Sequence, residues 1–267
     1  MALDILKLFK SLLFGCKQNK YKHAFTLSET LITLGVVGVV AAITLPSLVT
    51  DCQKLISRVR IQKAYTMLSQ TTYFAEAEYG PVNTWDYADG KAGQGWDIAQ
   101  DFAETYIVPY LRVASKCERN STNPACNYTM YGLNGVAHGD GQIDPPGKTY
   151  GFYLVDGTFV KVWAMNDRSS NVTAQKHLRQ VTIFYDIDGA KGQNKMGHDI
   201  FKLEYIIAST KKDVEWYGKM FPAYINKVNR NDLLSNKSEM CNKNRDGSAC
   251  LALIMRDGWV ISHDYPW

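Results

Sequence analysis

The sequence predicts an α+β protein in which a long N-terminal helix packs on an antiparallel β-sheet head. Residues 30–50 contain no charged side chain and residues 51–78 contain no Pro or Gly, which together favour one continuous helix. Beyond residue 150 the apolar residues fall instead in short segments separated by Asp-Gly pairs, as in antiparallel hairpins. A helix followed by a run of strands, rather than an alternation of the two, is typical of the α+β class.

The composition fits a folded head with an anchor. Hydrophobic residues make up 46% and charged residues 21% of the 267 residues, which is enough apolar surface to bury a core. The formal charge of +4 comes from residues 1–24, which hold five Lys and one Asp. The remainder has 25 basic and 25 acidic residues, so its net charge does not attract phosphate and nucleic acid is not an expected partner.

The apolar run at residues 30–50 is long enough to cross a membrane. A helix rises about 1.5 Å per residue, so about 20 apolar residues span a hydrocarbon layer about 30 Å thick. Glu29 lies at the start of the run. Because an unpaired charge in a bilayer costs about 2.5–3.5 kcal/mol, an acid here indicates a functional role. Pro46 removes a helical hydrogen bond and is expected to kink or loosen the helix.

The residues around this run resemble the prepilin motif of type IV pilins and of the pseudopilins of type II secretion. That motif has a basic leader, a small residue before the cleaved bond, Phe at the start of the mature chain, Glu as its fifth residue and a later Pro. Ala24, Phe25, Glu29 and Pro46 stand at these places, although most members have Gly where this chain has Ala24. The resemblance covers about the first quarter of the chain, and an ordinary signal anchor that contains a Glu is the alternative.

The resemblance implies a course of processing and assembly. The protein would enter the cytoplasmic (inner) membrane as a single-pass protein with an extracytoplasmic head. Prepilin peptidase would cut between Ala24 and Phe25, and Phe25 would be methylated. The regions implied are residues 1–24 as the leader, 25–50 as the transmembrane half of the helix, 51–79 as its amphipathic half and 80–267 as the head.

The implied function is that of a structural subunit, a pseudopilin or minor pilin of a type IV pilus or type II secretion filament. Its partners would be other pilins or pseudopilins, the prepilin peptidase and the inner-membrane assembly platform, and it would reach the filament or cell surface after assembly. One alternative is a membrane-tethered binding or adhesion protein that does not polymerise. An anchored enzyme is a second alternative. It is not favoured, because the sequence contains no H-E-x-x-H, G-x-S-x-G, P-loop or C-x-x-C motif.

The helix at residues 51–79 carries its apolar residues on two sides. One stripe consists of Ile61, Tyr65, Leu68 and Ala75, and the other of Leu55, Val59, Met67 and Phe74. A helix that packs on a single core needs only one stripe. Two stripes fit a helix that contacts its own head on one side and neighbouring subunits on the other; scatter within a short segment is the alternative.

The head is expected to contain one short helix and several strands. Gly80-Pro81 should end the long helix, and a helix at residues 97–110 should begin with Asp97 as its cap and have Ile98, Phe102 and Tyr106 on one face. The expected strands are 150–155 and 158–163 around Asp156-Gly157, then 181–185 and 200–207, and finally 251–255 and 259–262 around Asp257-Gly258.

Four cysteines of the head form two pairs with equal spacing. Cys117 and Cys126 are separated by eight residues, as are Cys241 and Cys250, and both loops are rich in small polar residues that allow the chain to fold back. In an oxidising extracytoplasmic compartment each pair should form a local disulfide. A four-thiolate zinc site is the alternative, but the close C-x₂-C spacing is missing. Cys52 is left either free or available for a cross-link between subunits.

One loop of the head could bind calcium. Residues 186–199 bring together Asp186, Asp188 and Asp199 with several glycines, and Ca²⁺ prefers six to eight oxygen ligands. The loop does not complete an EF-hand, because Gly197 stands where a bidentate Glu would be needed. Calcium is therefore a possible cofactor, a solvated Gly-rich turn is the alternative, and no other cofactor is expected.

Overall fold

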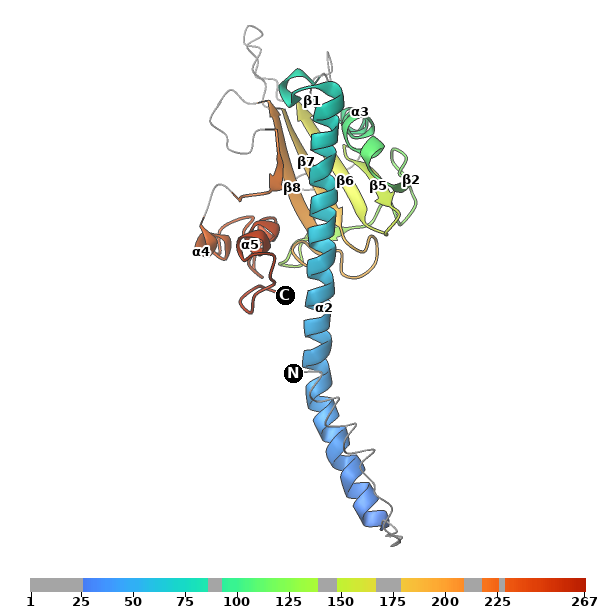
Figure 1. Cartoon of the computed structure of the whole chain (residues 1–267), viewed down its shortest axis with the longest axis vertical. Helices are drawn as coiled ribbons and strands as arrows, with labels where there is room; N and C mark the ends of the chain where they lie inside the picture. Colours follow the sequence, from blue (N-terminus) through green and yellow to red (C-terminus); the bar gives the residue numbers. More distant parts are fainter. Residues whose placement is uncertain (1–25, 86–92, 139–147, 167–178, 209–217, 226–228) are drawn as a thin grey trace. The chain divides into compact units, whose positions relative to one another are not determined.

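The computed structural model describes residues 26–85, 93–138, 148–166, 179–208, 218–225 and 229–267 (Figure 1). The chain divides into two compact units, Met1–Asp51 and Cys52–Trp267, which are described separately below. Ala24 and Phe25, the expected cleavage site, lie outside the described residues.

The first unit contains the start of helix α2, whose full bounds are Leu27–Tyr79. Its most apolar window has no buried residue, and the helix is long and apolar enough to span a membrane. Hydroxyl side chains in this part bond to carbonyls of the same helix: Thr44 Oγ1 donates to Val40 O and Thr50 Oγ1 to Pro46 O, each at 2.9 Å. Such internal pairing suits an environment without water. Residues on both sides of Pro46 are helical.

The second unit is α+β, as the sequence predicts. Its main sheet is antiparallel, with the strand order β2-β5-β6-β7-β8-β9 and with β1 paired to β6. The strands are β1 Gly93–Gln94, β2 Val113–Lys116, β5 Tyr150–Leu154, β6 Phe159–Asn166, β7 Arg179–Asp186, β8 Ile200–Ala208 and β9 Met220–Pro222. A second, two-stranded sheet joins β3 Met130–Tyr131 to β4 Ala137–His138.

The part of α2 after Cys52 crosses one face of this sheet (Figure 1). Residues of both elements share one buried core, because alternate residues of a strand face the same side. On β6 and β7 the core residues are Val160, Val162, Ala164, Val181, Ile183 and Tyr185. Their neighbours Lys161, Thr182 and Phe184 therefore face the opposite side of the sheet. The hydroxyl of Tyr185 also reaches α2, donating to the Ile61 carbonyl at 3.4 Å.

The end of α2 and the first hairpin follow the turn chemistry expected from the sequence. Gly80 stands just after the helix with φ +81°, a backbone conformation that glycine adopts without strain. Strands β5 and β6 flank Asp156-Gly157, and the turn is closed by the Gly157 N–H, which donates to Leu154 O at 3.0 Å. Helix termination and this hairpin are thus confirmed.

The short helix after residue 95 differs slightly from the expectation. Helix α3 spans Trp96–Tyr106, its N-cap is Gly95, and the 3₁₀ helix η2 follows at Val108–Tyr110. Asp97 is consequently not the cap but a residue of the first turn, where its negative charge interacts favourably with the helix dipole. Its expected apolar face is correct, since Ile98, Phe102 and Tyr106 are buried. A further 3₁₀ helix, η1, spans Val82–Thr84.

The prediction of a hairpin near the C-terminus is wrong. Residues 251–255 lie in helix α5, Cys250–Arg256, and 259–262 form no strand. The Trp259 N–H donates to Ile254 O and the Gly258 N–H to Met255 O, with Gly258 at φ +70°. This is the Schellman pattern that ends a helix, so Asp257-Gly258 caps a helix instead of joining strands.

Ion pairs connect the two C-terminal helices. Helix α4 spans Arg230–Leu233, and its N-cap is Asn229, whose side chain accepts a hydrogen bond from the Asp232 N–H. Arg230 pairs with Asp257 at 2.6 Å and with Asp264 at 3.0 Å, which joins α4 to the end of α5 and to the chain terminus.

Candidate functional site

The start of α2 carries Glu29 in a reciprocal cap. Oε2 of Glu29 accepts hydrogen bonds from the backbone N–H of Thr26 and from its hydroxyl, both at 2.9 Å. The Glu29 N–H donates in turn to Thr26 Oγ1 at 3.3 Å. This arrangement is a capping box, which satisfies donors that a helix end leaves unpaired. Sequence reasoning missed this local role, although the T-x-x-E pattern at residues 26–29 is its ordinary signal.

The second part of α2 has one buried and one exposed apolar side. Ile61, Leu68 and Ala75 are fully buried against the head. On the other side Val59 is 58% and Phe74 54% exposed, while Met67 is half-buried. The two stripes expected from the sequence therefore differ in burial. An exposed apolar row along a helix costs free energy in water unless another surface covers it.

A shallow groove runs beside this exposed side. It has a volume of about 320 Å³, and its apolar lining includes Met67, Phe74 and Val155. Lys63 on α2 and Asp156 in the β5–β6 turn form an ion pair of 2.7 Å at the groove. The groove and the exposed row together make an apolar surface with a polar edge, as at protein–protein contacts.

The acidic loop expected to bind calcium contains a deeply buried carboxylate. Asp186 is fully buried, and its Oδ2 accepts a hydrogen bond from the Tyr128 hydroxyl at 2.8 Å while its Oδ1 accepts from the Asp188 N–H at 3.2 Å. Burial and, second, the negative charge of Asp199 raise the pKa of Asp186 to about 9. The carboxyl group is therefore neutral near pH 7, which lowers the cost of burying it.

Asp199 uses its carboxylate to hold the loop backbone. It accepts hydrogen bonds from the N–H groups of Gln193 at 3.2 Å and Asn194 at 2.9 Å, and also from Lys195. Burial raises the pKa of Asp199, and the Lys195 N–H opposes this shift. The loop is thus organised by protein hydrogen bonds.

The third carboxylate of this loop, Asp188, has an oxygen without a partner. Its Oδ1 is buried and makes no hydrogen bond, and its Oδ2 lies 3.1 Å from where a Cβ on Gly192 would stand. Within the described ranges, no group of three or more His, Cys, Asp or Glu is placed to hold a metal ion. Calcium at Asp186, Asp188 and Asp199 accordingly stays a prediction.

Both disulfides join the cysteines that the spacing pairs. Cys241–Cys250 lies in the core with both residues buried, while Cys117–Cys126 borders a polar pocket that sequence reasoning missed. Cys52 is a free, exposed thiol. The pocket was missed because its lining comes from α3, a loop, β5 and β6, which only the fold brings together.

Comparison with known proteins gives one match. The model of a family described as a family of unknown function, DUF6613, matches residues 47–267. No curated protein and no solved structure matches the chain. The matched region contains the second part of α2 and the head, whereas Glu29 and Pro46 lie before it.

Proposed function

Since the chain belongs to DUF6613, a family of unknown function, we propose a role from its own residues: it is a structural subunit, a pseudopilin or minor pilin, of a type IV pilus or type II secretion filament. In this role it is inserted in the inner membrane, cut by prepilin peptidase between Ala24 and Phe25, and assembled with other pilins on the membrane platform. It is not an enzyme.

The observation that carries the proposal is the distribution of apolar surface along α2. Its first part exposes apolar residues on all sides, and its second part buries one apolar side and exposes another. A simple anchor needs the first feature only. The second feature is expected when neighbouring helices of other subunits cover the exposed side, as in a filament built from such helices.

Glu29 supports the same role. After cleavage at Ala24, the new amino group of Phe25 would be a cation one helical turn from this carboxylate. Within a filament, the amine of an incoming subunit could also pair with Glu29 of a neighbour, and charge pairs are much stronger in low dielectric than in water. Because the pair forms only at the correct stagger, Glu29 would fix the register of the helices.

The first test concerns processing. We expect mass spectrometry of the full-length protein, co-expressed with a prepilin peptidase, to find Phe25 at the N-terminus, ~14 Da heavier when methylated. Ala24→Leu, which places a large side chain before the cut, should leave the leader attached and serves as the control. A mature chain that still begins at Met1 would overturn the proposal.

The alternative is a tethered binding protein that does not polymerise, and a test of assembly distinguishes it from the filament subunit. It predicts an intact anchor and head but no contact with other pilins. Crosslinking in membranes that contain the partner pilins should give heterodimers through α2 if the filament role is correct. A chain that is cleaved yet always recovered alone would favour the binding protein.

A further inference from the structure

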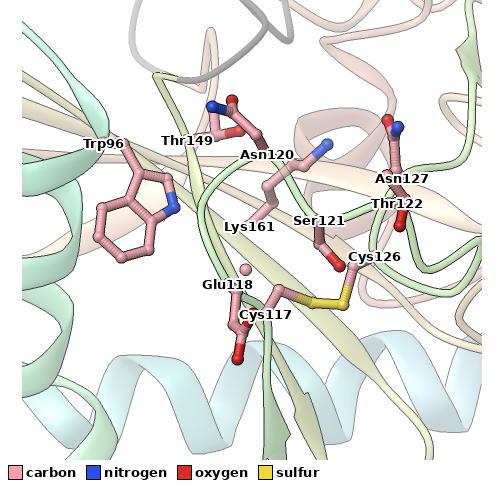
Figure 2. A pocket seen from close by; sticks show the side chains of 11 residues that line it. Trp96, Cys117, Glu118, Asn120, Ser121, Thr122, Cys126, Asn127, Thr149 and Lys161 are labelled. Atoms are coloured by element: carbon pink, nitrogen blue, oxygen red, sulfur yellow. A yellow bond between two sulfur atoms is a disulfide. The ribbon is translucent and has the colours of Figure 1, made fainter.

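A polar pocket of about 240 Å³ lies beside the Cys117–Cys126 disulfide (Figure 2). Its floor is formed by Gly151 on β5 and Lys161 on β6, which stand opposite each other in the strand register. Lys161 alternates with core residues of β6, so the pocket belongs to the side of the sheet that faces away from the α2 core. It is separate from the surface proposed for assembly.

The pocket walls are held in place by the fold. The Cys117 N–H donates to Gly151 O at 2.9 Å, which fastens the disulfide loop to β5. Arg119 of that loop pairs with Asp97 in the first turn of α3 at 3.3 Å. The pocket is therefore largely formed before any ligand arrives, as is usual for small-molecule sites.

Gly151 keeps the floor open. A Cβ at this position would lie 2.7 Å from Cζ of Phe159, so a larger residue would displace the ring. The Phe159 ring packs in turn on Tyr153, with 4.6 Å between ring centroids. An aromatic cluster thus supports the pocket from one side.

The lining combines one aromatic ring with several uncharged polar groups. Figure 2 shows the Trp96 indole on one side, Asn127 and Thr122 on the other, and Asn120 and Ser121 between them. In the part of the chain that the structure describes, neither amide side chain, Asn120 or Asn127, nor the Thr122 hydroxyl makes a hydrogen bond within the protein. These groups are available to a ligand.

The charges of the lining balance. Lys161, which is buried, and Glu118, which is exposed, are its two charged residues and have opposite signs. The lining therefore has no excess of positive residues that would favour an anion such as a nucleotide over a neutral ligand. Amides and hydroxyls both donate and accept hydrogen bonds, which matches ligands whose own groups do both.

We propose that this pocket binds a neutral saccharide, either one sugar or the terminal residue of a glycan. A pyranose ring has an apolar C–H face that the Trp96 indole can cover, since Trp combines a large apolar surface with a polar N–H. Its hydroxyls meet Asn120, Thr122 and Asn127. The head would then recognise a glycan while α2 serves assembly.

The test uses the full-length protein in nanodiscs, because many detergents carry sugar headgroups that would compete. Saturation-transfer NMR is recorded with methyl glucoside, methyl galactoside and N-acetylglucosamine as separate probes. We expect at least one sugar to receive saturation at its ring protons. Trp96→Ala should weaken that binding by about tenfold, as truncation of a central aromatic contact typically does.

Two further variants keep the result interpretable. Asn127→Ala removes an exposed side chain that the fold does not need, so its expected loss of affinity does not come from unfolding. Trp267→Ala is the matched control, because Trp267 is also partly buried and stacks on His198 outside this pocket. It should bind like the parent.

Several outcomes would overturn the saccharide site. These are the absence of transfer to all three sugars, an equal loss of binding in Trp267→Ala and Trp96→Ala, or stronger binding of the amino acid derivative N-acetylglycine than of any sugar. None of them bears on cleavage at Phe25 or on crosslinking through α2. The two proposals can therefore fail independently.

Discussion

Both parts of α2 carry apolar side chains, but among the described residues only the second part buries them against the head. Residues 52–79 bury six side chains against the head: Ile61, Ala64, Leu68, Thr71, Thr72 and Ala75. The most apolar window before Asp51 buries none. Fully burying one large aliphatic side chain is worth about 1.5–3 kcal/mol. The apolar side chains of this window therefore remain uncovered by the described residues, and in the proposed role a bilayer and neighbouring helices cover them.

The largest expected effect comes from the buried side of the second part. Leu68→Ala should lower the free energy of unfolding of the head by ~2–5 kcal/mol, because it leaves a cavity in the core. Val59→Ala, on the exposed side of the same helix, should change it by less than ~0.5 kcal/mol. Urea denaturation of the full-length protein in nanodiscs, followed by near-UV circular dichroism, measures both. Equal losses would mean that the two sides of the helix do not differ as described.

The two disulfides allow a second comparison, between the stability lost on removing a buried disulfide and that lost on removing one at a pocket. Both close loops with a sequence separation of nine, so chain entropy predicts a similar loss of about 2–3 kcal/mol when either is removed. Cys241 and Cys250 are in addition core residues. Replacing this pair by Ala should therefore lower the melting temperature more than replacing Cys117 and Cys126.

Peptide mapping without reduction checks the premise of that prediction. We expect Cys117 joined to Cys126, Cys241 joined to Cys250, and Cys52 as a free thiol in the monomer. Crossed pairs would refute the pairing, and four free thiols in protein taken from the cell envelope would refute both the pairing and the oxidising compartment.

A further effect concerns pH and the buried carboxylate of the head. The pKa of Asp186 rises from 3.8 to about 9 on folding, so the folded head keeps a proton that the unfolded chain releases between these values. The contribution of Asp186 to stability should therefore be fully present below about pH 4. It should be lost progressively as the pH rises toward 9. Asp186→Asn stays neutral and should flatten this fall, with a stability gain at pH 8.

The same titration also tests calcium. If Ca²⁺ were bound by Asp186, Asp188 and Asp199, the ion would favour the ionised carboxylates, and stability would rise with pH instead. Thermal melts at pH 5 and pH 8, each with calcium or with EDTA, separate the two cases. Stabilisation by calcium at pH 8 that Asp186→Asn abolishes would show that the loop binds calcium through an ionised Asp186.

The sequence was most informative where local chemistry decides the structure. The α+β class, the end of α2 at Gly80 and the hairpin at Asp156-Gly157 all follow from such signals. The C-terminal hairpin was predicted wrongly because the dipeptide Asp257-Gly258 can end a helix as well as join two strands. The short apolar run 251–255 also fits a buried helix as well as a strand. Only the long-range packing of α5 resolves that choice.

The candidate sites divide in the same way. Glu29 could be singled out because a charge beside an apolar run is visible in the sequence alone. The polar pocket could not, since Trp96 and Lys161 are 65 positions apart and meet only through the pairing of β5 with β6 and the placement of α3. Equally, the sequence could not show that Asp186 would be fully buried.

The charge of Glu29 and its cap can be separated by mutation. Glu29→Gln removes the charge but keeps a side chain that also serves in a capping box, whereas Thr26→Ala breaks the box and keeps the charge. Both variants should be inserted and cleaved like the parent. If the free carboxylate sets the register between subunits, only Glu29→Gln should fail to assemble.

The most direct test is therefore crosslinking of the parent, Glu29→Gln and Thr26→Ala to partner pilins in membranes that contain equal amounts of each. We predict that Glu29→Gln loses most of its crosslinked heterodimer, by about tenfold or more, as expected when a charge pair in low dielectric is broken. Thr26→Ala should retain it. If Glu29→Gln crosslinks as well as the parent, Glu29 serves only to cap α2, and the assembly role proposed for this chain is contradicted.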